Sequence, residues 1–167
     1  PGDAEESAVA WKMALESTNH PVCMAFTRQA ITVYEKADKD WKNTVRKGAY
    51  IVQEGTKNPD ITILATGSEV EMSLNAAKLV SGKNIRVVSV MDKTLFEKQD
   101  ESFQKEIIGN AKRVVVAEAG VSFGWEKYVS SKKDLFTIDR FGESGPAAKV
   151  AEDLKFTSAD LAKVLKG

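Results

Sequence analysis

Residues 61–80, ITILATGSEVEMSLNAAKLV, give the clearest indication of the fold class. The first part, ITILAT, is a run of apolar and β-branched residues, which is typical of a strand buried on both faces. Gly67 then allows a tight turn, and the residues from Ser68 onward carry apolar side chains at helical spacing. A buried strand that turns directly into an amphipathic helix is half of a βαβ unit. The stretch therefore predicts an α/β fold, and its helix is expected to point four side chains inward: Val70, Leu74, Ala77 and Leu79.

The same alternation continues on both sides of this stretch. Strands are predicted at AYIVQ, IRVVSV, RVVVAEA and LFTID, and helices at ESFQKEIIG, FGWEKYVSS, AAKVAEDL and SADLAKVLK, with Thr157 as the N-cap of the last helix. Because no crossover helix separates AYIVQ from ITILAT, AYIVQ is expected to pair antiparallel at an edge. The predicted fold class is α/β: a three-layer open sheet of about five strands, mostly parallel with one antiparallel edge strand, with helices on both faces.

The first 47 residues have a different character. Residues 5–16 predict a helix with Asp3 as its N-cap, and VCMAFT, residues 22–27, predicts a short buried strand. Residues 33–47 are rich in charges of both signs and have no clean periodicity. We expect them to form a solvated connector with room for a short helical turn.

The composition excludes several classes of function. Lysine plus arginine and aspartate plus glutamate both number 24, so the formal net charge is zero and no nucleic-acid-binding face is expected. No stretch approaches the roughly 20 apolar residues of a membrane span. The lone cysteine, Cys23, excludes an internal disulfide, fits a reducing compartment and favours a small buried side chain over a reactive thiol. Because the chain begins with Pro1 rather than Met, we expect it to start within a longer polypeptide.

Polar side chains capable of chemistry stand at the ends of two predicted strands. ATGSEVE, residues 65–71, could bind an anion at a helix N-terminus, but Ser68 and Glu71 are spaced as a capping box, which we favour. Glu118 ends a buried strand at the edge where α/β sheets bind ligands. It could act in acid–base chemistry, or it could accept backbone N–H groups from the loop at residues 120–124.

Two further candidates lie near the start of the chain. His20, the only histidine, has no second ligand residue nearby, so it predicts a surface loop and neither a metal site nor a catalytic triad. Arg28 follows an apolar run that ends at Phe26. Its guanidinium could hold a phosphate or carboxylate with two hydrogen bonds, or form an ordinary surface salt bridge. The residues alone leave these two alternatives open.

The loop TIDRFGESGP, residues 137–146, connects a predicted strand to a predicted helix. Its glycines and Pro146 suit a turn that leads into a helix. We expect Ser144 to cap that helix, and Asp139 and Arg140 to pair with each other or with neighbouring backbone.

Taken in order, these motifs resemble the C-terminal end of the transketolases. PGDAEESAVAW is similar to the family's P-A-D-A-N-E-T segment, AFTRQ to its strand ending in S/T-R-Q, and KGAYIVQE to G-G-Y-V-L. ATGSEVE is close to identical to a family hallmark. The remaining motifs follow in the family's order: RVVSVMDKTLFEKQD, VAEAG, GWEKYV, TIDRFGESGPAAKV and FTSADLAKVLK. The resemblance runs from Pro1 to Gly167 and departs at Glu5 and Ala30, where the family usually has Asn.

The resemblance implies a role in a larger enzyme. Transketolases are cytoplasmic homodimers that use thiamine diphosphate and a divalent metal, magnesium or calcium. They transfer a two-carbon ketol unit between sugar phosphates in the pentose phosphate pathway. By resemblance, residues 1–33 are the end of the pyrimidine-binding domain, 34–47 a linker and 48–167 the C-terminal domain. Arg28, in T-R-Q, matches the arginine that contacts the sugar phosphate.

The family's metal motif, its cofactor-activating glutamate and its catalytic histidines have no counterpart in this sequence. The chain is therefore expected to hold no catalytic, cofactor-binding or metal-binding residue. Its expected role is to complete the subunit and support the dimer, and it is expected to be inactive alone.

Two other functions remain open. The first is an autonomous ligand-binding or regulatory α/β module, with its ligand at the strand ends near Gly67, Gly120 and Gly142. The second is another thiamine-diphosphate enzyme with the same last domain, such as a deoxyxylulose-phosphate synthase or a dehydrogenase β-subunit. The wording of ATGSEVE and DRFGESGP favours the transketolases within that group.

Overall fold

The computed structural model describes residues 1–167 and contains one five-stranded sheet, in the order β1-β3-β2-β4-β5. Its strands are β1 (Ala49–Gln53), β2 (Ile61–Ala65), β3 (Ile85–Val90), β4 (Arg113–Glu118) and β5 (Leu135–Thr137). β1 pairs antiparallel with β3 at one edge, and the other pairings are parallel. The predicted mostly parallel sheet with one antiparallel edge strand is confirmed.

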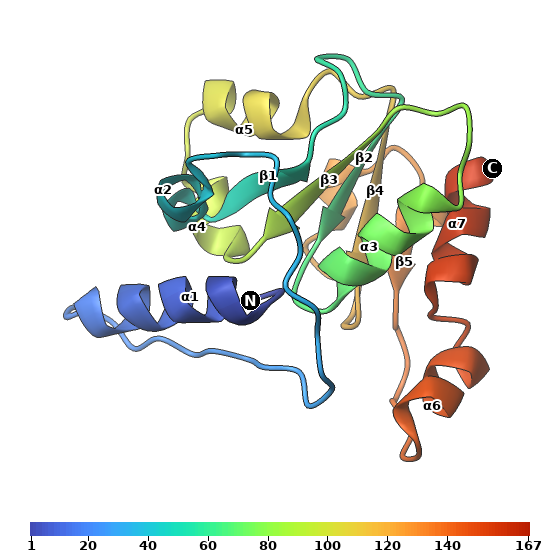
Figure 1. The fold of residues 1–167 in the computed structure, drawn as a ribbon, viewed down its shortest axis with the longest axis horizontal. Helices are drawn as coiled ribbons and strands as arrows, with labels where there is room; N and C mark the ends of the chain where they lie inside the picture. Colours follow the sequence, from blue (N-terminus) through green and yellow to red (C-terminus); the bar gives the residue numbers. More distant parts are fainter.

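Helices cover both faces of the sheet. α3 (Glu69–Lys78) and α7 (Ser158–Lys166) cover one face, and α4 (Lys93–Glu97) and α5 (Glu101–Ile108) the other. The remaining helices are α1 (Ala4–Glu16), α2 (Trp41–Thr44) and α6 (Ala147–Asp153). Short 3₁₀ turns are η1 (Val45–Lys47), η2 (Glu126–Tyr128) and η3 (Lys132–Asp134). In Figure 1, α3 and α7 lie side by side along the sheet, while α1 projects away from its lower end. No helix combines the length and apolar composition that crossing a bilayer requires.

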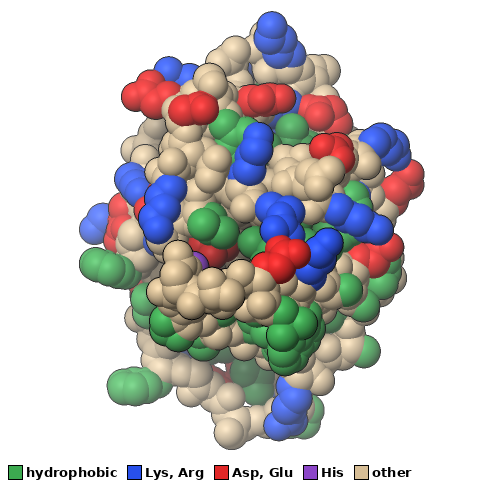
Figure 2. All heavy atoms as spheres, turned by 90° about the vertical axis from the view of Figure 1, so that its left-hand side faces the viewer, with side chains coloured by type: hydrophobic (Ala, Val, Ile, Leu, Met, Phe, Trp, Pro, Cys, Tyr) green, Lys and Arg blue, Asp and Glu red, His purple; other side chains and the backbone are tan.

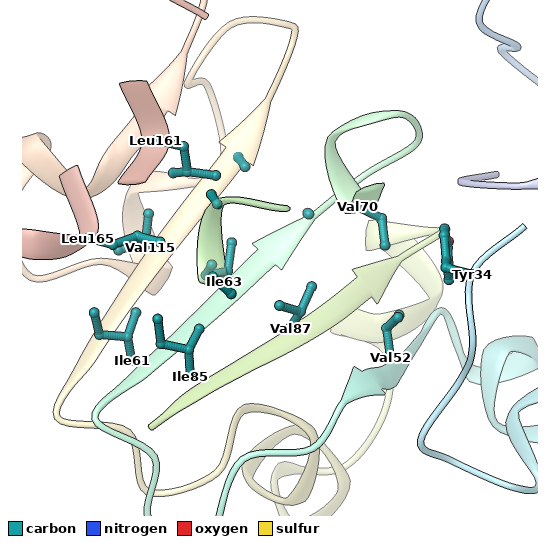
Figure 3. Close-up of a cluster of buried hydrophobic side chains, with 14 of the residues drawn as sticks. Tyr34, Val52, Ile61, Ile63, Val70, Ile85, Val87, Val115, Leu161 and Leu165 are labelled. Carbon is teal, nitrogen blue, oxygen red and sulfur yellow. The ribbon is translucent and has the colours of Figure 1, made fainter. Parts of the chain in front are cut away.

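One apolar layer lies between the sheet and the helices α3 and α7. Because successive strand residues point to opposite faces, Ile63, Val87 and Val115 of three neighbouring strands all enter this layer (Figure 3). They pack with Leu161 and Leu165 of α7, which are fully buried. This packing fixes the C-terminal helix on the sheet.

A second apolar layer lies on the opposite face. Leu64, Val88 and Val116 point into it and pack with Phe96 of α4 and Ile107 of α5. The sheet is therefore covered on both sides, and the predicted three-layer arrangement is confirmed.

The strand order creates a switch point between β2 and β4. β3 and β4 lie on opposite sides of β2, and the chain leaves β2 through α3 on one face and β3 through α4 and α5 on the other. The loops after β2 and β4 diverge, which opens a crevice at the carboxyl ends of these strands. In open α/β sheets this crevice is the usual place for ligands.

The helix caps predicted at Asp3 and Thr157 agree with the structure, whereas two predicted helix extents differ from it. Asp3 caps α1 by accepting the N–H of Glu6, and Thr157 caps α7 by accepting the N–H of Asp160, as predicted. Leu79 was predicted to point inward but is 52% exposed, because α3 ends one residue earlier. FGWEKYVSS contributes only the 3₁₀ turn η2 and not a full helix.

Residues 22–27 do not form the buried strand that their apolar run predicts. The segment has no regular secondary structure, and no backbone–backbone hydrogen bond involves residues 18–36. Cys23, expected to be a small buried side chain, is exposed. A strand is buried only where neighbouring strands pair with it, and this chain places none beside the segment.

The connector at residues 33–47 contains the expected helical turn, formed by α2 and η1. It is not uniformly solvated, however, because Tyr34, Lys36, Trp41 and Val45 are buried. Tyr34, Trp41 and Val45 belong to the apolar layer that α3 and α7 cover, at its β1 end.

Candidate functional site

Two clefts lie at the carboxyl ends of the strands. The first, which we call the Arg28 cleft, has a volume of about 630 Å³ and lies between residues 27–29, the start of α3 and the loop before α6. The second, the Glu118 cleft, has a volume of about 710 Å³ and lies between residues 22–29 and the ends of β2, β3 and β4. In both clefts, the N-terminal segment at residues 22–29 forms one wall, and residues that follow the sheet strands form the other.

Arg28 is exposed and faces the first cleft without a partner in the chain. Its side chain forms no ion pair and no hydrogen bond. The other four arginines each pair with a carboxylate: Arg46 with Glu16, Arg86 with Glu54, Arg113 with Asp134 and Arg140 with Glu143. The surface salt bridge that was one alternative for Arg28 is therefore absent, and all of its N–H donors are available to a ligand.

Glu118 joins the two loops that diverge at the switch point. Its Oε2 accepts a hydrogen bond from the hydroxyl of Thr66 at 2.8 Å, and its Oε1 accepts one from the backbone N–H of Gly120 at 3.0 Å. The expectation that Glu118 accepts backbone N–H groups of the following loop is confirmed. Both carboxylate oxygens thus hold the ends of β2 and β4 together.

The start of α3 is negatively charged and differs from the predicted capping box. The Ser68 hydroxyl donates to the Glu69 carboxylate at 2.7 Å and makes no capping bond, while Glu71 accepts a long bond from the N–H of Thr32. The capping-box prediction is wrong because Ser68 has helical backbone angles, φ −61° and ψ −21°, and not the extended angles of a capping residue, so its hydroxyl oxygen accepts no N–H of the helix. Burial, and the nearby charge of Glu118, raise the pKa of Glu69 above its usual range.

In the loop at residues 137–146, Asp139 does not pair with Arg140; it bonds to backbone and hydroxyl groups, and bonding to neighbouring backbone was the other expected alternative. The Asp139 carboxylate accepts from the Thr137 hydroxyl at 2.6 Å and from the N–H and hydroxyl of Ser122 at 2.8 and 2.9 Å. These bonds hold the pKa of Asp139 below its usual value. Arg140 pairs with Glu143 instead, at 2.5 Å.

Ser144 is not the cap of α6. The N-cap position of this helix is Pro146, and no side chain caps it. The reason is local: Pro146 fixes the backbone at the helix start, so the serine lies outside the first turn.

His20 lies in an exposed loop near Ser17 and Asn19, as predicted. No group of three or more His, Cys, Asp and Glu side chains that could hold a metal ion occurs in the structure. Figure 2 shows charged side chains of both signs interspersed on one face, with hydrophobic side chains gathered in its lower half. The exposed hydrophobic side chains of the N-terminal part include Trp11, Leu15, Val22 and Phe26.

Sequence reasoning missed a buried ionic cluster at the start of α1. Glu6 and Asp3 are buried, and so are their partners Tyr34, Lys36 and Tyr50. These pairs join residues 28 to 44 positions apart, so no local periodicity or spacing signals them. The one sequence signal is the acidic first turn of α1, which the helix dipole alone explained.

Fold and clefts together define a three-layer α/β domain whose strand ends face an N-terminal segment. Residues 48–157 match the profile of the transketolase-like TK C-terminal domain. Over 99% of its length, the chain is 48% identical to the transketolase of Treponema pallidum and 41% identical to a probable transketolase of Streptococcus pneumoniae, covering 25% of each. A solved mutant transketolase of Pichia stipitis is 33% identical with a TM-score of 0.89, over 99% of this chain and 24% of that one.

The chain belongs to the transketolase family. It spans about a quarter of the length of the relatives that it matches.

Proposed function

We propose that this chain forms the C-terminal portion of a transketolase, the thiamine-diphosphate enzyme that moves a two-carbon ketol unit between sugar phosphates. The observation that carries the proposal is the match to transketolases over 99% of this chain and 25% of theirs. In this proposal the complete enzyme is a cytoplasmic homodimer of the pentose phosphate pathway. Residues 1–33 end its pyrimidine-binding domain, 34–47 form the linker and 48–167 the C-terminal domain.

The N-terminal segment supports a first domain that other residues complete. Residues 18–36 make no backbone–backbone hydrogen bond, so most of their backbone N–H and C=O groups are free to pair with another strand. Trp11, Leu15 and Phe26 are exposed by 54%, 79% and 50%, which is unusual for large apolar side chains so near one another. In the proposed enzyme, the rest of the pyrimidine-binding domain covers this surface.

Arg28 is proposed to bind the phosphate of the sugar substrate. Its support is the unpaired guanidinium at the edge of a cleft of about 630 Å³. A guanidinium donates two parallel hydrogen bonds to phosphate oxygens and stays charged at every physiological pH. In this proposal Arg28 contributes to substrate binding, because it holds the phosphate end of the sugar.

The side chains of this chain do not fit the cofactor. No group of three or more potential metal ligands occurs that could hold a divalent ion with a diphosphate. Thiamine diphosphate supplies carbanion stabilisation when it is bound, and in this proposal the earlier domains bind it together with magnesium or calcium. The chain alone is accordingly proposed to be structural, dimer-supporting and inactive.

The test is an assay of purified residues 1–167 with xylulose 5-phosphate and ribose 5-phosphate, in the presence of thiamine diphosphate and magnesium. The complete enzyme serves as the positive control, and circular dichroism verifies that the chain is folded. We expect no turnover by the chain alone. Turnover that persists after repurification would contradict the proposal.

The switch-point crevice favours one alternative, an autonomous ligand-binding or regulatory module. A thermal-shift screen of the isolated chain with nucleotides and sugar phosphates distinguishes the two functions. A concentration-dependent rise in Tm would favour the module, since a ligand stabilises only the state that binds it.

A further inference from the structure

The carboxylate of Glu6 joins three parts of the chain. Its Oε2 accepts the backbone N–H of Gly2 at 2.7 Å, and its Oε1 accepts the hydroxyls of Tyr34 and Tyr50 at 2.6 and 2.7 Å. Glu6 and Tyr50 are fully buried. Three donors satisfy a carboxylate that no water reaches, and they come from the chain start, the connector and β1.

A buried ion pair lies on the same end of α1. Lys36 Nζ donates to the carboxylate of Asp3, to that of Glu5 at 2.8 Å and to the carbonyl of Tyr34 at 3.0 Å. The rings of Tyr34 and Trp41 lie 4.6 and 4.8 Å from the same ammonium group. We call Asp3, Glu6, Tyr34, Lys36 and Tyr50 the α1 anchor, because together they fix the amino end of this helix on the sheet.

The rest of α1 leads to Arg28. The helix has 13 residues, so fixing its first turn sets the direction of the whole element. Trp11 stacks on Phe26 with ring centroids 6.5 Å apart and an angle of 18° between the planes. Ala10 and Met13 line the Glu118 cleft together with Phe26. Phe26 precedes Arg28 by two residues, so α1 is the element that locates the segment carrying Arg28.

We propose that Glu6 is a positioning residue for phosphate recognition: through the α1 anchor and the Trp11–Phe26 stack it holds Arg28 at the cleft. This inference rests on the proposed function of Arg28. Glu6 touches no substrate, and its effect on the reaction is limited to substrates that carry a phosphate.

A substitution that hardly changes the size of the Glu6 side chain is enough to disrupt its hydrogen bonds. In Glu6→Gln, an oxygen that accepted hydrogen bonds becomes an NH₂ group that donates. The new donor must face either the N–H of Gly2 or the hydroxyls of Tyr34 and Tyr50. A tyrosine hydroxyl that accepts from the new NH₂ group loses the buried acceptor for its own proton. Tyr34→Phe is milder, because it removes one donor and leaves the carboxylate and its two other bonds.

The experiment uses the complete transketolase that carries this chain, with xylulose 5-phosphate and unphosphorylated xylulose as donors. For Glu6→Gln we expect the KM for xylulose 5-phosphate to rise about tenfold, because small displacements of a binding group are costly, and for Tyr34→Phe we expect a smaller rise. The kcat should stay within about twofold and kcat/KM for xylulose should not change. Tyr128→Phe is the matched control, since it removes a tyrosine–carboxylate bond, to Glu97 at 3.2 Å, that is not part of the α1 anchor.

Three outcomes overturn the inference. The first is an equal loss of kcat/KM for both donors, which a purely structural role would give. The second is an unchanged KM for xylulose 5-phosphate in both variants. If Glu6→Gln fails to fold, Tyr34→Phe alone decides.

The third outcome concerns an Arg28→Ala enzyme measured in parallel. If this enzyme keeps the preference for the phosphorylated donor, the assignment of Arg28 fails and this inference fails with it. If Arg28→Ala loses that preference while Glu6→Gln and Tyr34→Phe keep it, only the role of Glu6 is overturned.

Discussion

Lys36→Met removes the one positive charge among the buried carboxylates of the α1 anchor. Lys36 and Asp3 are 6% and 1% exposed, so solvent screens their interaction very little. Methionine fills a similar volume but leaves Asp3 buried without its partner. Breaking a buried pair in this way costs about 3–5 kcal/mol, because the remaining charge is uncompensated. For a chain of this size, the free-energy loss corresponds to a fall in Tm of about 6–20 °C.

A matched surface variant controls for the change of residue type. Lys105 pairs with Glu101 at 3.2 Å, but the two side chains are 75% and 88% exposed. An exposed pair contributes about 0–1 kcal/mol, so Lys105→Met should be nearly neutral. Urea unfolding of the unsubstituted chain, Lys36→Met and Lys105→Met, followed by tryptophan fluorescence, gives the three free energies of unfolding. If the free energies of unfolding of Lys36→Met and Lys105→Met differ by less than about 1 kcal/mol, the buried pair contributes no more than a surface pair and the predicted cost is wrong.

Three further outcomes are expected. Gly48 has a φ of +103°, and an added Cβ would collide with the backbone of Asp92 and Phe96, so Gly48→Ala should destabilise the chain by more than roughly 1–3 kcal/mol in urea. Gly82→Ala, at a φ of +73° with nothing within 4 Å, should cost less. Thr157→Ala removes the cap of α7 and should cost about 1 kcal/mol in the same assay. Burial alone would lower the pKa of Lys36, but the bonds of Lys36 to Asp3 and Glu5 outweigh burial, so its pKa is raised. Burial and the charge of Glu6 raise the pKa of Tyr34 and of Tyr50. The folded state therefore holds these protons more tightly than the unfolded state, so stability should fall as the pH rises above about 10; a stability that is flat or rising from pH 9 to 11 would show that the sign is wrong.

The sheet could be predicted because its signals are local. ITILAT and IRVVSV are short, mostly apolar runs with β-branched residues on both faces, which is typical of a strand between two others in a covered sheet. The antiparallel edge strand followed from connection length alone, since a parallel crossover needs a dozen or more residues. Asp3 and Thr157 were found as caps because a cap depends on residues only three positions away.

The errors arose where a residue's environment comes from distant parts of the chain. The strand predicted at residues 22–27 has the right composition but lacks neighbouring strands, so its apolar side chains and Cys23 are exposed. Ser68 had capping-box spacing, but its helical backbone angles keep its hydroxyl oxygen from accepting an N–H of the helix. The α1 anchor depends on tyrosines and a lysine from the connector and β1, and no spacing rule brings those together. Arg28 could be identified as a candidate anion-binding residue because it follows an apolar run. Its lack of a carboxylate partner is visible only in the three-dimensional structure.

The proposed role of Arg28 is tested most directly by the donor preference of the complete enzyme with Arg28→Ala. Hydrogen bonds to a charged group contribute about 1.5–3 kcal/mol, which corresponds to a fall of roughly 10- to 150-fold in kcat/KM for xylulose 5-phosphate. Unphosphorylated xylulose makes no such bond, so its kcat/KM should change by less than about twofold. A selective loss of the phosphorylated donor is the predicted result. An equal loss for both donors, or no loss for either, would contradict the account.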